Sequence, residues 1–437
     1  MWTHKYWLSH PVILSALIGA VALAILLPAT AVTNPARQFP PGTDSAQYLA
    51  IGKSIAQGHG YRDTVGFWPE LPAYDRMPVW PVFLSIALKV SPAKASPEAV
   101  ARFTNAICLA LAGAAFGLLC RRLRVRPALC LAAGLSVSLS PILMYYGNEG
   151  MSEISFVFVV GTGLALAFSG SRYLYPASLI IGLGPLVRSN FIMVPVLCFG
   201  LAFGIPGLRG KLRAHCSLSR ALLALLLVLL PTIAWTMRNY AITGRPFLVS
   251  SLDGETLYGS NNDATANNLV YWGYWVFPDS IPGERPKAEL ARSLASDLAV
   301  NDYYRQKGIA WIRGHISAMP RLIVGKMVRA AVPVPWAQSP PPAEFAAFLC
   351  RFMVQLSFLA LIPYWWPQMN RTYVFFLAAL ILCHVITTVI FYGSARFSYC
   401  FLEIFFVPCI FCGIEMLLSR RLSGSSRFPA LAVAAPR

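Results

Sequence analysis

Residues 11–27 read PVILSALIGAVALAILL, an apolar run without a charged side chain. A helix of this length can span the hydrocarbon core of a bilayer. Lys5 precedes the run, so we expect its amino end to stay in the cytoplasm. The following Ala29-Thr30-Ala31 resembles a signal-peptidase site, but the run is longer than a signal-peptide core, which favours an uncleaved anchor.

The composition of the whole chain agrees with a membrane-spanning first helix. Of the 437 residues, 57% are hydrophobic and only 12% are charged, and the mean hydropathy is +0.58. This is too apolar for a soluble globule and indicates a polytopic membrane protein. The net charge of +18 does not indicate a nucleic-acid partner, because Arg and Lys gather in short loops between apolar runs.

Further apolar runs predict the remaining spans. They lie at about 97–120, 128–146, 153–170, 174–187, 190–207, 220–238, 345–364, 372–391 and 398–418. With the first run this makes about ten transmembrane helices. We therefore expect an all-α polytopic membrane protein, with interfacial helices in the first external loop and a small external domain.

The charges between the runs predict which loops face the cytoplasm. Basic residues follow alternate runs, and acidic residues collect in the other loops. The expected divisions are an N-terminal transmembrane region at 1–238 that includes the first external loop at 32–96, an external loop domain at 239–344, C-terminal helices at 345–420 and a cytoplasmic tail at 421–437. We expect the protein in a bacterial inner membrane, with its site on the extracytoplasmic face.

The first external loop concentrates acidic residues. Its stretch at 40–80 reads PPGTDSAQYLAIGKSIAQGHGYRDTVGFWPELPAYDRMPVW and holds Asp44, Asp63, Glu70 and Asp75. Asp44 is an acceptable N-cap for a short helix with apolar residues at near-helical spacing, and Gly58 and Gly60 can end it. We expect this helix, and a second one over 77–90, to lie on the membrane face.

Charged residues at membrane edges are functional candidates by default, because burying a charge there is costly. Those that project to the same predicted face are Asp44, Asp75, Arg76, Glu149, Glu153, Arg188, Arg238 and Arg396. Arginines can hold a phosphate by paired hydrogen bonds, and a carboxylate can deprotonate or orient an acceptor hydroxyl. Such a set suits a reaction on an anionic, lipid-linked substrate.

Simpler interpretations stay open for several of these side chains. Asp44 could only cap its helix, and Asp75 could form a local ion pair with Arg76. Glu153 could favour the dipole of the helix that it opens, and Arg238 could reach lipid headgroups from a span end. Arg188 and Arg396 are harder to explain in this way, because each lies on the face that positive charge avoids.

Other chemistries lack support in the sequence. The six histidines are scattered without ligand spacing, so we predict no histidine metal site. The ten cysteines all lie in or beside apolar runs, which makes a disulfide framework improbable. No P-loop, GxGxxG or GxSxG motif is present.

A series of short motifs resembles a known family. The motifs are Thr43-Asp44-Ser45 with Tyr48, Gly58-His59-Gly60-Tyr61, Arg76-Met77-Pro78-Val79-Trp80-Pro81, Ser152-Glu153, Leu186 to Asn190, Trp235-Thr236-Met237-Arg238-Asn239-Tyr240, Tyr258-Gly259-Ser260-Asn261-Asn262 and Arg396-Phe397. Their order resembles that of GT-C fold membrane glycosyltransferases. More narrowly, it is similar to glycosyltransferase family 39, the protein O-mannosyltransferases and lipid A aminoarabinose transferases.

The resemblance implies a sugar donor on a polyprenyl or dolichyl phosphate, inversion at the anomeric carbon, and a divalent cation requirement that varies among members. The acceptor would be a lipid, a protein or a glycan. By position, Asp44 would be the catalytic base or acceptor-orienting group and Glu153 a second catalytic acid. The implied substrate-binding residues are Tyr48, Asp75, Arg76, Arg188, Arg238, Asn261 and Arg396.

Two other functions remain open at this stage. A flippase or transporter for lipid-linked sugars would place charges near the bilayer midplane, at broken helices. An O-antigen polymerase or ligase would share the chemistry of sugar transfer. The sequence names neither the sugar nor the acceptor.

Overall fold

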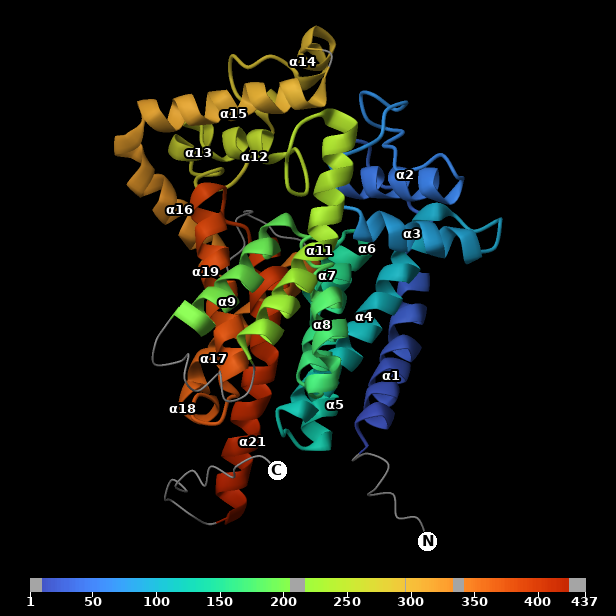
Figure 1. The fold of residues 1–437 in the computed structure, drawn as a ribbon, viewed down its shortest axis with the longest axis vertical. Helices are drawn as coiled ribbons and strands as arrows, with labels where there is room; N and C mark the ends of the chain where they lie inside the picture. Colours follow the sequence, from blue (N-terminus) through green and yellow to red (C-terminus); the bar gives the residue numbers. More distant parts are fainter. Residues whose placement is uncertain (1–9, 205–216, 295, 333–341, 424–437) are drawn as a thin grey trace.

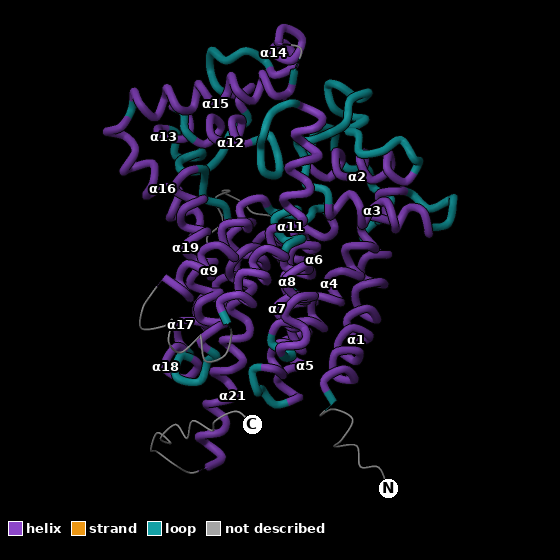
Figure 2. The backbone as a smooth tube through the Cα atoms, viewed as in Figure 1, coloured by secondary structure: helices purple, strands orange, loops and turns teal. Residues whose placement is uncertain are grey.

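The computed structural model describes residues 10–204, 217–294, 296–332 and 342–423. Within these ranges the regular structure is helical, apart from one isolated β-bridge between Arg62 and Pro72. Figure 2 shows helices joined by short loops through the bundle and by longer loops at one end. The expectation of an all-α chain is therefore confirmed for the described residues.

Within the described parts of the chain, six helical segments are long and apolar enough to cross a membrane, judged by length and composition. They are α1 (Pro11–Val32), α4 (Pro97–Arg122), the pair α5 (Pro127–Ser138) and α6 (Pro141–Asn148), α11 (Leu218–Thr243), α19 (Arg371–Ile390), and the segment Ala395–Leu422. The last comprises α20 (Ala395–Phe397), short π and 3-10 turns, and α21 (Val407–Ser423).

The other four predicted spans form shorter helices than expected. They are α7 (Glu153–Ala167), α8 (Leu174–Ile181), α9 (Met193–Gly204) and α17 (Pro342–Ala360). At 1.5 Å per residue, the 15 residues of α7 cover about 22 Å, less than the ~30 Å hydrocarbon core. The structure thus supports six spans by length where the sequence predicts about ten. Part of the predicted span 190–207 and most of the tail 421–437 lie outside the described residues.

One end of the bundle carries two helices that lie across the others. These are α2 (Asp44–Ala56) and α3 (Val79–Val90), which pack on each other beside the ends of α1 and α4 (Figure 1). Both predicted helices of this loop are present. The N-cap is Thr43 rather than Asp44: the Thr43 side chain accepts from the backbone N–H of Ala46. The Asp44 carboxylate is therefore free for other partners.

A second group of helices covers the same end of the bundle. This cap, residues 245–332, contains α12 (Asp253–Ser260), α13 (Asp263–Asn267), α14 (Lys287–Leu294), α15 (Asp297–Gly314) and α16 (Met319–Ala331) (Figure 1). It has its own apolar cluster, formed by Tyr258, Val276, Ile281, Leu290, Ala291, Val300 and Tyr304. The chain enters the cap where α11 ends at Gly244, whose φ of 67° is a left-handed C-cap conformation.

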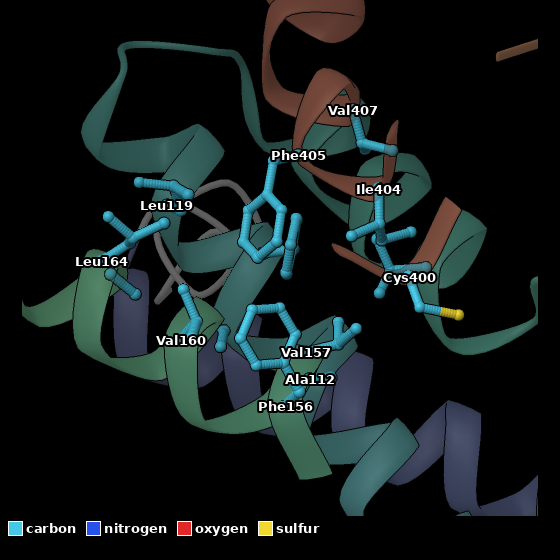
Figure 3. Close-up of a cluster of buried hydrophobic side chains, with 14 of the residues drawn as sticks. Ala112, Leu119, Phe156, Val157, Val160, Leu164, Cys400, Ile404, Phe405 and Val407 are labelled. Atoms are coloured by element: carbon cyan, nitrogen blue, oxygen red, sulfur yellow. The ribbon is translucent and has the colours of Figure 1, made fainter. Parts of the chain in front are cut away.

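The main core lies between α1, α4, α5, α7, α19 and the α20–α21 segment. Figure 3 shows the part where α4 and α7 meet the last segment, with Phe156 and Phe405 among the labelled side chains. The rings of Phe156 and Phe401 stack with centroids 5.5 Å apart. Phe156, Cys400 and Phe401 also line the cavity described below, so this core forms its floor.

Candidate functional site

A cavity of about 840 Å³ opens between the bundle and the two groups of helices at its end. Its walls come from the 42–77 segment of the first loop, the residues around Arg188, the cap, and the end of α19 with the following turn. Polar side chains are not spread evenly along these walls. The three arginines among the lining residues, Arg76, Arg188 and Arg396, lie together at what we call the arginine end, because they share Asp44 and Glu153 as partners.

The arginine end is organised around Asp44. Its Oδ1 lies 2.9 Å from Nη1 of Arg76, and its Oδ2 lies 3.6 Å from Nη2 of Arg396. Burial alone would raise the pKa of Asp44, but the charges of Arg76, Arg396 and Arg188 lower it to about 2. The side chain retains 35% of its exposed surface, so an anionic carboxylate faces the cavity between two guanidinium groups.

Glu153 binds Arg188 and Arg396 from outside the cavity. This first residue of α7 is fully buried, and it accepts hydrogen bonds from Nη2 of Arg188 and Nε of Arg396 on the same Oε1 atom. Glu153 does not line the cavity. The sequence suggested it as a second catalytic acid; in the structure it lies beneath the two arginines, and that role stays a prediction.

The two arginines come from chain segments far apart in the sequence. Arg188 lies in an extended conformation just before a 3-10 turn, and Arg396 lies in the short helix α20. The ring of Phe397 separates them, with its centroid 4.7 Å from the Arg188 guanidinium carbon and 5.3 Å from that of Arg396. Stacking on one ring and bonding to one carboxylate fix both guanidinium groups in place.

Arg76 is fixed by the helix that carries Asp44. Its Nε donates to Oε1 of Gln47 at 2.8 Å, and its guanidinium lies 5.7 Å from the ring centroid of Tyr48. Asp75 adds a weaker contact, with Oδ2 3.9 Å from Nε of Arg76. The residues predicted at 44, 48, 75 and 76 therefore form one cluster with Arg188 and Arg396.

A second part of the cavity is acidic. Asp63, Asp75 and Asp297 lie near one another there, with Asp75 adjoining Arg76, and Asp253, Glu255 and Asp279 also line the cavity. The lysine among the lining residues, Lys287, forms an ion pair with Glu255 at 2.6 Å. Burial and the nearby Asp75 raise the pKa of Asp297 to about 7. The cavity thus offers both arginine and carboxylate groups.

Gln47 lies where the two parts meet. It accepts from Arg76 through Oε1, and its Nε2 donates to Oδ2 of Asp63 at 3.0 Å. A single amide thereby orients one side chain from each part of the cavity. Gln47 was not among the residues predicted from the sequence, although its position one turn after Thr43 places it on the same helix face as Asp44.

Two predicted substrate-binding residues lie away from the cavity. Arg238 donates to the backbone oxygen of Ala73 at 2.6 Å and stacks on Trp235, with the ring centroid 4.4 Å away. Asn261 is fully buried between the cap and the end of α19. Neither lines the cavity, although Ala73, the partner of Arg238, does, and the assignment of both residues to substrate binding stays a prediction.

No group of three or more His, Cys, Asp or Glu side chains within the described ranges is arranged to hold a metal ion. Of the histidines, His384 lines the cavity, and its Nε2 is 3.0 Å from the Ser398 hydroxyl. Aromatic side chains complete the walls, among them Trp68, Tyr74, Trp275 and Tyr392. The site can therefore offer arginine, carboxylate and aromatic contacts.

Comparisons with known proteins give structural likeness only. No protein-family model matches the sequence, and no curated protein matches it. The fold is similar to the apo oligosaccharyltransferase of Archaeoglobus fulgidus, with a TM-score of 0.48 and 16% identity over 98% of this chain and 53% of that one. This chain thus spans about half the length of that protein.

A second solved structure is similar as well. It is ArnT from Cupriavidus metallidurans bound to undecaprenyl phosphate, with a TM-score of 0.43 and 16% identity. The match covers 93% of this chain and 78% of that one.

Proposed function

We propose that this protein is a membrane glycosyltransferase of the GT-C type, and more narrowly one similar to family 39. It would transfer a sugar from a polyprenyl-phosphate donor to an acceptor hydroxyl or phosphate, with inversion at the anomeric carbon. One observation carries the proposal: Arg76, Arg188 and Arg396 converge with the Asp44 carboxylate at one end of a large cavity.

The arginine end suits the phosphate of such a donor. A sugar phosphodiester carries one negative charge at any working pH, and guanidinium groups bind phosphate oxygens through paired hydrogen bonds. Arg76 and Arg396 now face Asp44. A bound phosphate would compete with Asp44 for them, and Glu153 would hold Arg188 and Arg396 in place during the exchange.

This exchange of partners gives Asp44 its chemical role. With both arginines against it the carboxylate is a weak base, because its pKa is held at about 2. When the donor phosphate takes over hydrogen bonds of Arg76 and Arg396 and offsets their charge, the carboxylate becomes more basic. It can then accept the proton of an acceptor hydroxyl or orient that hydroxyl for attack.

The bond changes balance without a further reactant. The acceptor oxygen forms a bond to the anomeric carbon, and the bond from that carbon to the phosphate oxygen breaks. The electron pair leaves with the lipid phosphate, whose charge the arginines stabilise. The acceptor proton goes to Asp44, and attack opposite to the leaving phosphate inverts the anomeric centre.

The apolar floor can accommodate the start of a lipid chain. Phe156, Phe391 and Phe401 line the cavity, and Phe156 and Phe401 belong to the main apolar core of the bundle. Lipid-linked donor, acceptor and membrane are the partners that we propose. The site would lie on the extracytoplasmic face of a bacterial inner membrane.

The reaction can be tested directly with purified protein. The protein is incubated with a panel of polyprenyl-phosphate sugars and extracted envelope lipids or glycans. Chromatography of the lipid fraction then measures the release of free polyprenyl phosphate. Wild-type protein should release it, and Glu70→Gln, in which an exposed side chain of the first loop is changed, should do so equally. Movement of intact donor across proteoliposomes without release would instead show a transporter.

A further inference from the structure

Lys326 is a fully buried lysine outside the cavity. Its Nζ donates to Oδ1 of Asn261 at 2.8 Å and to the backbone oxygens of Val389 at 3.1 Å and Ile390 at 3.4 Å. All three acceptors are uncharged, and no ion pair of Lys326 is present within the described residues. Burying an ammonium group without a counter-charge costs free energy, so the presence of Lys326 at this position calls for a structural reason.

The acceptors belong to two different parts of the molecule. Asn261 ends α12 in the cap, and it also donates from Nδ2 to the oxygen of Ile390 at 3.1 Å. Val389 and Ile390 are the last residues of α19, where backbone oxygens lack helical partners. Lys326 on α16 therefore places a cation on the negative end of α19, which is the favourable end for it.

Three glycines show how closely the same segments approach. A Cβ atom added to Gly393 would lie 1.9 Å from the oxygen of Lys326, and one added to Gly273 would lie 2.1 Å from the carbonyl carbon of Gly325. The N–H of Gly393 donates to the oxygen of Gly273 at 3.1 Å. Backbone contact without intervening side chains leaves little freedom for residues 391–394.

This turn leads directly to the site. Tyr392 lines the cavity and packs on Phe397, with ring centroids 5.4 Å apart. Arg396 follows three residues after Gly393 and contacts both Asp44 and Glu153. A displacement of the turn would therefore move the guanidinium group away from its position in the arginine end.

We infer that Lys326 and Asn261 form a clip that couples the cap to the end of α19 and thereby positions Arg396 for the lipid phosphate. Lys326 is a positioning residue, since it touches neither the cavity nor Arg396. The inference rests on the proposed function for its kinetic consequence. The mechanical part, that the clip orders residues 391–396, does not depend on the reaction.

The protonation of Lys326 provides a distinguishing readout. Burial lowers the pKa of its ammonium to about 7, so the clip should loosen as the pH rises through neutrality. The other ionisable groups on the segments packed around it are Asp253, Glu255, Tyr258, Asp263, Tyr271, Tyr274, Arg321, Arg329, Cys383, His384, Tyr392 and Arg396. Of the carboxylates, Asp253 pairs with Arg305 and Glu255 with Lys287, and Asp263 is 71% exposed and hydrogen-bonded to Trp311, so none of them neutralises Lys326.

The experiment compares Lys326→Met with wild type and with Lys307→Met, which removes an exposed lysine of the cap. Hydrogen–deuterium exchange at pH 6.5, read by mass spectrometry, should be faster for residues 391–396 in Lys326→Met and unchanged in Lys307→Met. Equal exchange in all three proteins would overturn the clip, whatever the protein catalyses.

Kinetics then test the positioning. At pH 6.5 the kcat for lipid-phosphate release should fall about tenfold in Lys326→Met, because small displacements of a catalytic group are costly. The decline of the wild-type kcat above pH 7 should vanish in this variant. An active variant with the wild-type pH profile would refute the positioning role, whereas an inactive wild type would contradict only the proposed function.

Discussion

Glu403 and Asp44 are both paired with arginines, and the two sites differ in whether a ligand can reach the pair. Glu403 pairs with Arg351 at 2.6 Å inside the bundle, with side-chain exposures of 4% and 1%. Asp44 pairs with Arg76 and Arg396 at the cavity, where its own exposure is 35%. Only the second group faces space that a ligand can enter.

The Arg351 pair is closed on itself. Its Nε donates to both oxygens of Glu403 at 2.9 Å, and Nη1 and Nη2 donate to the backbone oxygens of Val332 and Ala330 at the end of α16. Gln355 donates to the same carboxylate at 2.8 Å. The arrangement fastens α16 to α17 and leaves no guanidinium face for a substrate. The Arg351–Glu403 pair therefore has a structural role, whereas we propose a chemical role for Asp44 and its arginines.

The largest expected effect is on activity at Asp44. Asp44→Asn should lower kcat about 10²- to 10⁴-fold, since it removes the group that accepts or orients the acceptor proton. The fold should persist, because the N-cap of α2 is Thr43. Lipid-phosphate release by the purified variant measures the loss, and its melting temperature provides the control. Near-normal release would remove Asp44 from the mechanism.

Arg351→Met should lower the stability of the fold and leave the chemistry at the cavity unchanged. It leaves the buried Glu403 carboxylate without its counter-charge, which typically costs about 3 to 5 kcal/mol. Thermal unfolding in detergent should show a large drop in stability, while the surviving folded fraction should keep its specific activity. A stable but inactive Arg351→Met protein would mean that the closed pair also belongs to the reaction.

Asp297 tests the acidic part of the cavity through pH. Its pKa is raised to about 7 in the folded protein from an ordinary value of 3.8, so the folded state holds a proton that the unfolded chain has lost. This contribution to stability is present at low pH and disappears as the pH rises through about 7. Asp297→Asn should therefore raise the melting temperature relative to wild type at pH 8 but not at pH 4. Equal differences at both values would contradict the buried carboxylate.

The smallest effect is expected at Arg126 and Glu415. Their bidentate pair, with Nη2 and Oε1 2.8 Å apart, is 35% and 22% exposed. Glu415→Gln should lower the melting temperature far less than Arg351→Met, because solvent screens such pairs. Thermal unfolding measures this, and a loss as large as that of Arg351→Met would show that exposure does not separate the two kinds of pair.

The sequence predicts much of this site because charge near a membrane is rare. Arg188 and Arg396 stood out by their predicted face, and the structure brings both to Asp44 and Arg76. The sequence could not identify Gln47 or Asp297 as site residues, because a polar residue in a polar loop looks ordinary until the folded structure shows its neighbours. Asn261 belonged to a short motif, but its burial against Lys326 depends on contacts 65 residues apart along the chain.

The sequence predicted the helical type of the fold better than the number of membrane-spanning helices. Apolar runs identify helices, yet run length overstates the span when a glycine or proline breaks the helix. The run at 174–187 is an example: α8 stops at Ile181, and Gly182 packs against the backbone of Val228 on α11. Such a break comes from helix packing, which the apolar pattern does not record. Thr43 rather than Asp44 caps α2 for a similar reason, because both are good caps and only the folded loop decides.

The partner exchange at Asp44 is tested most directly by the affinity for undecaprenyl phosphate. Binding to purified protein in nanodiscs should weaken about ten- to a hundredfold in Arg76→Met, because hydrogen bonds to a charged group contribute about 1.5 to 3 kcal/mol. It should strengthen in Asp44→Asn, which removes the competing carboxylate, and stay unchanged in Arg126→Met. Unchanged affinity in both Arg76→Met and Asp44→Asn would contradict a phosphate site at the arginine end of the cavity.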